Sequence, residues 1–232
     1  MKTIAMIPTY NEAGTIESLM RDIRSLPDNV GVLVVDDNSP DGTAAIVERI
    51  ASMDPKVQVL LRRENRGRGW AGRDGFKKAL DLGADYIIEM DGDGSHAPAH
   101  IHEMITAAKN ADVVIGSRYC AGGSDEQRTL LRRVVSTLAR TYLALVLGVK
   151  VGDPTSGFRL FKRAVIEAIL PHLHARDPFT VTEVLYWVRR SKYVIKEVPI
   201  QFLSRGAGES KLKPWTLFIY LIKVVLLRLK NI

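Results

Sequence analysis

Cysteine is nearly absent from this chain of 232 residues, because Cys120 is the only one. A single thiol excludes an internal disulfide and any metal site built from clustered cysteines. The N-terminal segment MKTIAMIPTYNE lacks the long apolar core and cleavage site of a secretory signal, so we expect the chain to stay in a reducing compartment. Internal repeats and low-complexity stretches are also lacking, and one globular domain is expected.

No apolar run is long enough to cross a bilayer. The C-terminal segment LKPWTLFIYLIKVVLLRLKNI is rich in leucine, isoleucine and valine, but Lys223 and Arg228 interrupt it before the roughly 20 apolar residues that a span needs. We expect an amphipathic helix over residues 214–229, whose cations and Trp215 lie in an anionic membrane interface. The lysines that would face the headgroups are Lys211, Lys213 and Lys230. A helix packed against the domain is the alternative.

The overall composition is that of a globular protein with an excess of positive charge. Hydrophobic residues make up 46% of the chain and charged residues 25%, and the formal net charge is +7. Such a charge suits nucleic acid, an anionic membrane surface or a phosphorylated small molecule. We expect no nucleic-acid partner, because no recognised nucleic-acid motif is present and the basic residues recur beside phosphate-site motifs.

Up to about residue 117, short apolar runs alternate with segments of helical periodicity. Strands are expected over residues 3–8, 30–36, 57–62, 86–90 and 112–117. Helices are expected over residues 14–26, 41–53, 74–82 and 98–109. This alternation predicts an α/β fold with a Rossmann-like, mainly parallel central sheet flanked by helices.

After residue 117 the order of elements changes. A polar loop over residues 118–128 and a long helix over residues 129–147 are expected, followed by GDPTSGFRLF, two helical segments and a strand ending near Phe202. No linker separates the two halves, so we expect residues 1–211 to form one domain. Residues 212–232 would be appended to it.

Polar and acidic residues recur just after the first, second and fourth expected strands. They lie in PTYNE, DDNSPDG and DGDGSH, respectively. Ligands of open α/β sheets bind beyond the carboxyl ends of the strands. We therefore expect these three loops to converge on a ligand.

Asp91 and Asp93 flank Gly92 at the end of the fourth expected strand. Two carboxylates at this spacing repel unless a cation lies between them, and hard oxygen ligands suit Mg²⁺ or Mn²⁺. A cation held there could bridge two phosphates and offset the charge on a departing nucleoside diphosphate. A solvated acidic turn is the alternative, because Asp-Gly pairs are common in turns.

The first loop suits recognition of a base. Tyr10 and Glu12 place an aromatic ring and a carboxylate where a base and its ring nitrogens could be bound. Asn11 or Thr9 could instead, or in addition, cap the next helix.

The second loop brings three carboxylates together, on Asp36, Asp37 and Asp41. An acid after the second strand of an α/β nucleotide site commonly binds ribose hydroxyls. A capped turn accounts well for Asp41, but less well for the two adjacent acids.

Six motifs carry a resemblance over nearly the whole chain. They are PTYNE, VVDDNSPDGT, DGD followed by SHAP, GSRY, DPTSGFR and RGAGESKL. In this order and spacing the chain resembles the family-2 glycosyltransferases and, within them, the polyprenol-phosphate mannose synthases. The resemblance implies a glycosyltransferase A fold and inverting, metal-dependent transfer of mannose from GDP-mannose to a polyprenyl phosphate such as dolichyl phosphate.

The resemblance also implies roles for individual residues. Those matching nucleotide-sugar positions are Pro8, Tyr10, Glu12, Asp37, Asp41, Asp91, Asp93, Arg205 and Lys211. Those matching acceptor-phosphate positions are Arg118, Arg132 and Ser136. Those expected to carry catalysis are Asp93, Arg118, Arg205 and Lys211. Residues 1–117 would bind the nucleotide-sugar, and residues 118–211 would bind the acceptor.

Two departures from the family pattern affect the site. Arg73 replaces the second asparagine of the pattern NxGxxxAxNxG, and glycines surround the aspartates in DGDGSH. Ser95 falls where some members place a third metal ligand, so Asp91, Asp93 and Ser95 are the expected ligands of Mg²⁺ or Mn²⁺. A serine hydroxyl is a weaker ligand than a carboxylate.

Arginines dominate the expected acceptor half. Arg132 and Ser136 stand four apart and would share one helix face, and a guanidinium fits phosphate oxygens well. An ordinary solvated basic face is the alternative for Arg132, because other arginines crowd that helix. Glu183 matches a family acid near the acceptor, where it would orient a sugar hydroxyl or pair with Arg189 or Arg190.

A phosphate acceptor explains why no strong general base is expected. A phosphate monoester has a second pKa of about 6, so its oxygen is already anionic near neutrality. A UDP-sugar such as UDP-glucose is the alternative donor, and a non-catalytic nucleotide-binding module is the alternative class. We expect a peripheral protein at the cytoplasmic face of a membrane, attached directly or through an anchoring partner subunit.

Overall fold

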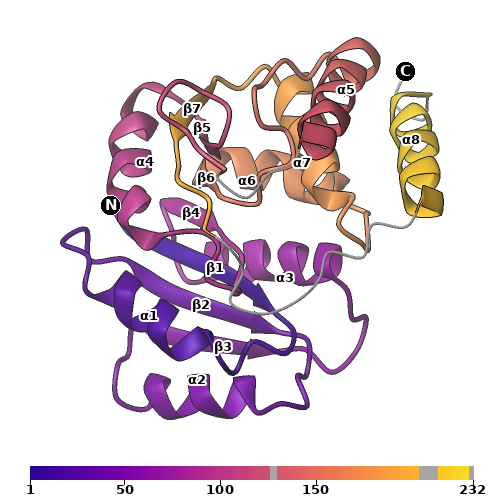
Figure 1. The fold of residues 1–232 in the computed structure, drawn as a ribbon. Helices are drawn as coiled ribbons and strands as arrows, with labels where there is room; N and C mark the ends of the chain where they lie inside the picture. Colours follow the sequence, from indigo (N-terminus) through magenta and orange to yellow (C-terminus); the bar gives the residue numbers. More distant parts are fainter. Residues whose placement is uncertain (126–129, 204–213, 230–232) are drawn as a thin grey trace.

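A mixed sheet flanked by helices makes up the described part of the chain, residues 1–125, 130–203 and 214–229 of the computed structural model (Figure 1). Its strands are β1 (Thr3–Thr9), β2 (Gly31–Asp36), β3 (Val57–Leu61), β4 (Tyr86–Glu89), β5 (Val113–Ser117), β6 (Arg159–Lys162) and β7 (Ile195–Pro199). Its helices are α1 (Ile16–Arg24), α2 (Thr43–Ala51), α3 (Arg68–Asp81), α4 (Ile101–Ala107), α5 (Leu130–Leu147), α6 (Arg163–Ile169), α7 (Thr180–Arg190) and α8 (Pro214–Leu229). Short 3₁₀ turns at Pro98–His100, Ala108–Asn110 and Leu170–His172 flank α4 and follow α6.

The strand order of the sheet is β3-β2-β1-β4-β6-β5-β7. β6 pairs antiparallel with β4 and β5, whereas the other neighbouring pairs are parallel. The carboxyl ends of β1, β2 and β4 therefore lie at one edge of the sheet, with β1 in the middle. The expected mainly parallel sheet is confirmed.

Helices cover both faces of the sheet, and successive residues of a strand point to opposite faces. In β1, Ile4 and Met6 belong to the core shared with α3 and the helices of the second half, whereas Ala5 and Ile7 belong to the core shared with α1, α2 and α4. All four side chains are buried. This burial on both faces explains why β1 and β2 are continuously apolar.

Helix α3 begins six residues earlier than the helix expected over residues 74–82. Its first turns contain glycines, which disfavour helix formation. A Cβ atom at Gly69 would lie 2.1 Å from the carbonyl oxygen of Ala175, and one at Gly75 would lie 2.7 Å from Sδ of Met6. Close backbone packing requires these glycines, and local sequence periodicity does not reveal that requirement.

Strand β6 has no counterpart among the expected strands. It is four residues long and begins at Arg159, whose side chain is fully buried. The carbonyl oxygens of Val181 and Pro154 accept hydrogen bonds from its guanidinium at 2.7 and 2.9 Å. A buried arginine interrupts the apolar run by which a strand is recognised. For this reason the sequence pattern does not predict β6.

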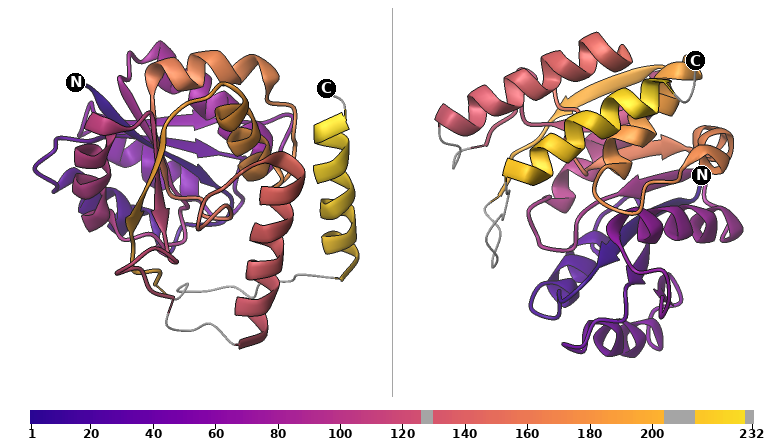
Figure 2. Two further views of the ribbon diagram at one scale, coloured as in Figure 1. Left: turned by 90° about the horizontal axis from the view of Figure 1, so that it is seen from above. Right: turned by 90° about the vertical axis from the view of Figure 1, so that its right-hand side faces the viewer.

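The expected C-terminal helix is present as α8, which lies beside α5 in both views of Figure 2. Tyr142 donates its hydroxyl to the carbonyl oxygen of Leu221 at 2.9 Å, and Lys223 pairs with Asp177 instead of projecting as an interfacial cation. Packing against the domain is thus confirmed, whereas membrane association stays a prediction. In the described part of the chain, no helix is long and apolar enough to cross a membrane.

Candidate functional site

The loops after β1, β2 and β4 converge at the carboxyl edge of the sheet, as expected. The amide of Ala13 donates to Oδ2 of Asp41 at 2.9 Å, which joins the first loop to the second. The hydroxyl of Thr15 donates to the carbonyl oxygen of Gly92 at 2.7 Å, which joins the first loop to the third. These bonds hold the three acidic loops in fixed relative positions.

In the second loop, Asp36 and Asp37 both bind within the protein. Asp36 is fully buried and accepts hydrogen bonds from the Thr9 hydroxyl and the Ser39 amide, each at 2.8 Å. Asp37 pairs with Arg62 and accepts the amide of Gly67 at 2.7 Å. Asp36 therefore supports the loop, and ribose binding by Asp37 stays a prediction.

Asp41 stabilises the start of α2, so the capped turn is confirmed for this residue. Oδ1 accepts the amide and hydroxyl of Thr43 at 3.0 and 2.6 Å. Burial opposes ionisation, but the hydrogen bonds from Thr43 and Ala13 outweigh it and lower the pKa of the Asp41 carboxyl. Asp41 is consequently a fixed negative charge at the candidate nucleotide site.

The candidate base site lies around Tyr10, whose side chain is 51% exposed. The guanidinium of Arg66 lies 4.7 Å from the centre of the tyrosine ring. Pro8 is half-buried two residues earlier in β1. Because the Thr9 hydroxyl binds Asp36, it does not cap α1. An exposed ring beside a guanidinium can stack on a planar base.

Glu12 lies close to the other carboxylates of the three loops. Burial raises the pKa of its carboxyl, and the charges of Asp93, Asp91 and Asp41 raise it further, against a hydrogen bond from Thr15. A carboxyl whose neighbours disfavour its charge marks a place that a cation stabilises. The three loops therefore form a site of negative potential.

Hydrogen bonds fix the aspartates of the third loop. Oδ1 of Asp93 accepts the hydroxyl and the amide of Ser95 at 2.6 and 3.0 Å, and Ser95 is fully buried. The amide of Asp91 donates to Nδ1 of His96 at 3.2 Å, and a Cβ atom at Gly157 would lie only 3.1 Å from Oδ2 of Asp91. This loop is thus a partly buried structure, and the carboxylate of Asp91 faces a neighbouring backbone position that must remain small.

The donor set fits a hard divalent cation. Asp91 and Asp93 supply carboxylate oxygens, whereas Nδ1 of His96 already accepts the amide of Asp91, and burial lowers the pKa of its ring. Within the described ranges, no three His, Cys, Asp or Glu side chains gather into a metal site. Mg²⁺ usually binds one or two carboxylates together with water and substrate phosphate oxygens. The Ser95 hydroxyl already donates to Asp93, so its role as a third ligand stays a prediction.

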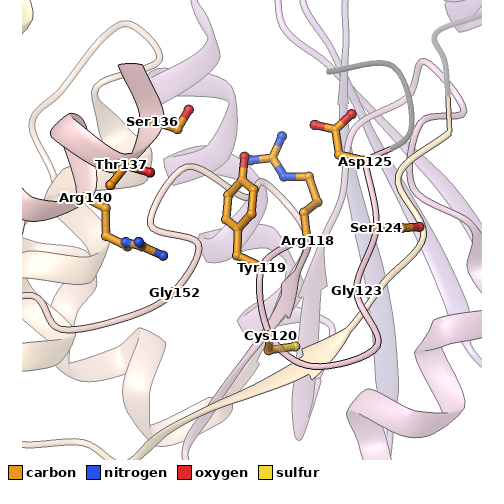
Figure 3. A pocket seen from close by; sticks show the side chains of 10 residues that line it. All are labelled: Arg118, Tyr119, Cys120, Gly123, Ser124, Asp125, Ser136, Thr137, Arg140 and Gly152. Atoms are coloured by element: carbon orange, nitrogen blue, oxygen red, sulfur yellow. The ribbon is translucent and has the colours of Figure 1, made fainter. Parts of the chain in front are cut away.

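Arg118 and Ser136, two residues expected to bind the acceptor phosphate, line one pocket of about 560 Å³. Figure 3 shows Arg118 and Tyr119 near the middle of this pocket, with Ser136, Thr137 and Arg140 contributed by α5. Arg118 donates to Asp153 through Nε at 2.7 Å and through Nη2 at 2.8 Å. The structure therefore brings a polar helix face and a fixed guanidinium together.

Arg140 is a candidate that the sequence analysis missed. It follows Ser136 by four residues on α5 and lines the same pocket. The spacing of four residues was the available signal, because such residues share one helix face. The side chain of Arg132, together with Arg205 and Lys211, lies outside the described residues.

The end of the described second half reaches the aspartate loop. The amide of Leu203 donates to the carbonyl oxygen of Ser95 at 3.1 Å, and His96 and Phe202 form an antiparallel bridge. The ring of His96 stacks on Phe158 with a centroid distance of 5.1 Å. Elements far apart in sequence thus meet beside Asp91 and Asp93.

Glu183 has a role that neither sequence interpretation gave. Its buried carboxylate accepts the amides of His174 and Ala175 at 2.9–3.1 Å. Pairing with Arg189 or Arg190 is wrong, because Arg189 donates to the carbonyl oxygen of Gly148 and Arg190 donates to the Tyr186 hydroxyl. Glu183 holds the backbone that packs on the first turn of α3, and orientation of a sugar hydroxyl by Glu183 stays a prediction.

Comparison with known proteins agrees with this geometry. The chain is 36% identical to polyprenol monophosphomannose synthase of Mycolicibacterium smegmatis over 214 residues, 91% of this chain and 81% of that protein. It is 36% identical to undecaprenyl-phosphate mannosyltransferase of Micrococcus luteus over 213 residues, 91% of this chain and 88% of that protein.

A solved structure confirms the expected glycosyltransferase A fold. Glucosyl-3-phosphoglycerate synthase of Mycobacterium tuberculosis, in complex with Mn²⁺, uridine diphosphate and glucosyl-3-phosphoglycerate, superposes with a TM-score of 0.71 at 20% identity. The match covers 99% of this chain and 79% of that one. The family model described as Glycosyl transferase family 2 matches residues 4–170. By this match and by its relatives, the chain belongs to glycosyl transferase family 2.

Proposed function

We propose that this chain transfers mannose from GDP-mannose to a polyprenyl phosphate, with inversion at the sugar and with Mg²⁺ or Mn²⁺ bound. The names of the two relatives support the sugar and the lipid phosphate. The paired carboxylates of Asp91 and Asp93 support the cation, as does the Mn²⁺ of the solved neighbour. The single observation that carries the proposal is that Arg118 and Ser136 meet in one pocket.

The acceptor would be its own nucleophile. A phosphate monoester is anionic near neutrality, so the protein needs to align it and neutralise its charge, without removing a proton. Arg118 is held in place by Asp153 through Nε and Nη2, so Nη1 is the group that would donate to the phosphate, while Arg140 offers a second cation from α5. Arg205 and Lys211 keep their expected roles at the donor diphosphate.

The donor would lie across the three acidic loops. Tyr10 and Glu12 would contact the base, and Asp37 and Asp41 would contact the ribose. Pro8 would pack beneath the nucleoside. Asp91 and Asp93 would hold a divalent cation, which supplies positive charge to the departing diphosphate. Burial opposes the charge of Arg118, but Asp153 outweighs it and raises the pKa of the guanidinium, and the more distant charges of Asp125 and Asp91 add to this effect.

A transfer assay with two donors tests the proposal. The protein is incubated with Mn²⁺ or Mg²⁺, polyprenyl phosphate and either labelled GDP-mannose or labelled UDP-glucose, and the lipid is then extracted. Label from GDP-mannose is expected in the lipid. Transfer from UDP-glucose but not from GDP-mannose would mean that the donor is a UDP-sugar. Binding of nucleotide without transfer from either donor would indicate a non-catalytic module.

A cheaper experiment addresses the base separately. The thermal unfolding temperature is measured with GDP or UDP, each with the metal present. A ligand that binds only the folded chain raises this temperature in proportion to its affinity. GDP is expected to give the larger increase, and a larger increase with UDP would favour a UDP-sugar donor.

Residues 212–232 are proposed to attach the catalytic domain of residues 1–211 to the cytoplasmic face of a membrane. The inward stripe of α8, at Tyr220, Val224 and Leu227, belongs to the core or packs on it. The opposite stripe consists of exposed apolar side chains, namely Phe218, Ile222, Val225 and Leu229. A helix that is apolar on both faces can dock on the protein and bury its outer face in a lipid interface. An anchoring partner subunit is the other candidate for this face.

A further inference from the structure

Arg68 lies between the sheet and the aspartate loop, and none of the motifs gave it a role. It is the first residue of α3, and its guanidinium reaches the end of β4. Nη1 donates to Oε1 of Glu89 at 2.8 Å, and Nη2 donates to Oδ1 of Asp91 at 3.3 Å. One arginine therefore joins a buried carboxylate to a candidate metal ligand.

The start of α3 cannot move away from this position without breaking backbone contacts. The amide of Gly69 donates to the carbonyl oxygen of Arg176 at 3.0 Å. Cβ atoms at Gly67 and Gly69 would lie 2.6 and 2.1 Å from the carbonyl oxygens of Arg176 and Ala175. Glu183 in turn binds the amide of Ala175. This packing fixes the backbone from which Arg68 extends.

Glu89 is shared between two cations. Its side chain is 3% exposed, and its register partner across the sheet is Arg159. Burial lowers the pKa of Arg159 to about 10, so this arginine stays charged at neutral pH. Glu89 therefore does not neutralise both Arg68 and Arg159. The guanidinium of Arg68 therefore keeps positive charge for its second carboxylate, Asp91.

The two contacts of Arg68 differ in strength. The bond to Glu89 has the length of a charge-assisted hydrogen bond, whereas the bond to Asp91 is longer and Asp91 is 35% exposed. Burial would lower the pKa of Arg68, but the charges of Glu89 and Asp91 outweigh it and raise the pKa. Glu89 is thus the anchor, and Asp91 is the contact that a cation at the aspartates would weaken.

We propose that Arg68 is an anion-binding and positioning residue, which holds Asp91 before the divalent cation binds and then donates Nη2 to an oxygen of the donor diphosphate. The inference rests on the proposed function for the identity of the donor, but the chemistry requires only a diphosphate and a divalent cation. The arginine and the cation compete for Asp91 and cooperate on the diphosphate. Their effects on metal binding and on anion binding therefore have opposite signs.

Binding measurements on purified full-length protein test these signs. Mn²⁺ binding is followed by electron paramagnetic resonance, and binding of inorganic pyrophosphate or GDP at saturating Mn²⁺ is followed by calorimetry. The variants are Arg68→Leu, Arg68→Lys and the control Arg63→Leu, which changes an exposed arginine in the loop before α3. Thermal unfolding identifies any variant that fails to fold, and Arg68→Lys then carries the test.

Arg68→Leu is expected to bind Mn²⁺ alone as tightly as the parent or more tightly, and to bind Mn²⁺-pyrophosphate about tenfold more weakly, the loss expected for one charge-assisted hydrogen bond. Arg68→Lys should recover part of the pyrophosphate affinity, and Arg63→Leu should match the parent. Unchanged pyrophosphate binding in Arg68→Leu would overturn the inference. So would a matching loss of Mn²⁺ affinity, which would mean that Arg68 only supports Asp91.

The outcomes for the donor and for Arg68 are separable. A parent protein that binds Mn²⁺-pyrophosphate but not Mn²⁺-GDP contradicts the proposed donor and leaves the role of Arg68 standing. A parent protein that binds Mn²⁺-GDP while Arg68→Leu binds it equally well contradicts the role of Arg68 alone. A parent protein that binds neither Mn²⁺ nor pyrophosphate overturns both.

Discussion

Arg118 and Asp153 form a two-pronged ion pair, with Nε to Oδ2 at 2.7 Å and Nη2 to Oδ1 at 2.8 Å. Asp153 is fully buried, and Glu197 of β7 accepts its amide at 2.9 Å. Hydroxyl Oγ1 of Thr155 accepts a further bond from Arg118 at 2.8 Å. The arginine of the candidate acceptor site is therefore oriented by the sheet before any phosphate arrives, which lowers the entropic cost of binding.

Replacing Asp153 by asparagine should give a pH-dependent loss of stability. Burial opposes ionisation of Asp153, but hydrogen bonding and charge from Arg118 outweigh it and lower the pKa from the ordinary value of 3.8. A depressed pKa stabilises the folded state above the unfolded value, and this stability is lost as the pH falls through the folded value. We expect Asp153→Asn to lower the free energy of unfolding by about 3 kcal/mol at pH 6, as for a broken buried ion pair.

Urea unfolding of parent and Asp153→Asn between pH 6 and pH 3 measures this effect. The difference between the two proteins should be full at pH 6 and should narrow below about pH 3.8, where the parent begins to lose the contribution of Asp153. A difference that stays constant over this range would mean that the carboxylate charge does not stabilise the fold.

The roles of Ser95 and Asp93 can be distinguished by the effects of their substitution on the metal dependence of sugar transfer. Asp93→Asn should reduce sugar transfer by about a hundredfold or more, because a metal ion supplies several kcal/mol of charge stabilisation. Ser95→Ala removes only the 2.6 Å bond that orients Asp93, so it should raise the Mn²⁺ concentration for half-maximal transfer by about tenfold. Saturating Mn²⁺ should restore most of its activity. If saturating Mn²⁺ does not restore Ser95→Ala, the Ser95 hydroxyl does more than increase the metal affinity of the site.

The first half of the fold could be predicted because its signals are local. Continuous apolar runs mark β1 and β2, since both faces of these strands are buried. The convergence of three polar loops then follows from the parallel order of the strands. β6 and the first turns of α3 were not predicted, because their signals depend on backbone that is distant in sequence. In β6 an arginine is buried, and in α3 the glycines pack closely on backbone such as the carbonyl oxygen of Ala175.

The candidate site was predicted less completely than the fold. Motifs identified Asp91, Asp93 and Arg118, but they could not show which carboxylates bind within the protein. Asp36 is one of these, because its partners Thr9 and Ser39 lie at the ends of β1 and β2. Arg68 escaped for a related reason, since its contact with Glu89 spans 21 positions of the sequence.

Arg140 should affect the acceptor selectively. Arg140→Leu removes a cation from the pocket that Arg118 and Ser136 also line, so KM for polyprenyl phosphate should rise about tenfold, as expected for one charge-assisted contact. KM for the nucleotide-sugar should stay at the parental value, because Arg140 does not line the acidic loops. Steady-state kinetics with each substrate varied in turn gives both constants. Arg21→Leu, a change at an exposed arginine of α1, is the control.

An Arg140 variant in which both KM values rise together would contradict this assignment. Such a result would indicate that α5 had shifted as a whole and disturbed both sites. Comparison with Arg118→Gln sharpens the test, because Arg118 is bonded to Asp153 as well as lining the pocket. Arg118→Gln should therefore lower the unfolding temperature, whereas Arg140→Leu should not.

The outer face of α8 should determine binding to vesicles. Ile222 and Val225 are exposed on the stripe opposite Val224, which is fully buried. The double change Ile222→Asp and Val225→Asp should weaken sedimentation with anionic vesicles about tenfold or more, because burial of one such side chain is worth about 1.5–3 kcal/mol. Its unfolding temperature should match that of the parent, since neither side chain lies in the core. Met53→Asp, at an exposed position after α2, is the matched control. Equal vesicle binding by the double variant and the parent would exclude this face as the membrane contact and would leave a protein partner as its occupant.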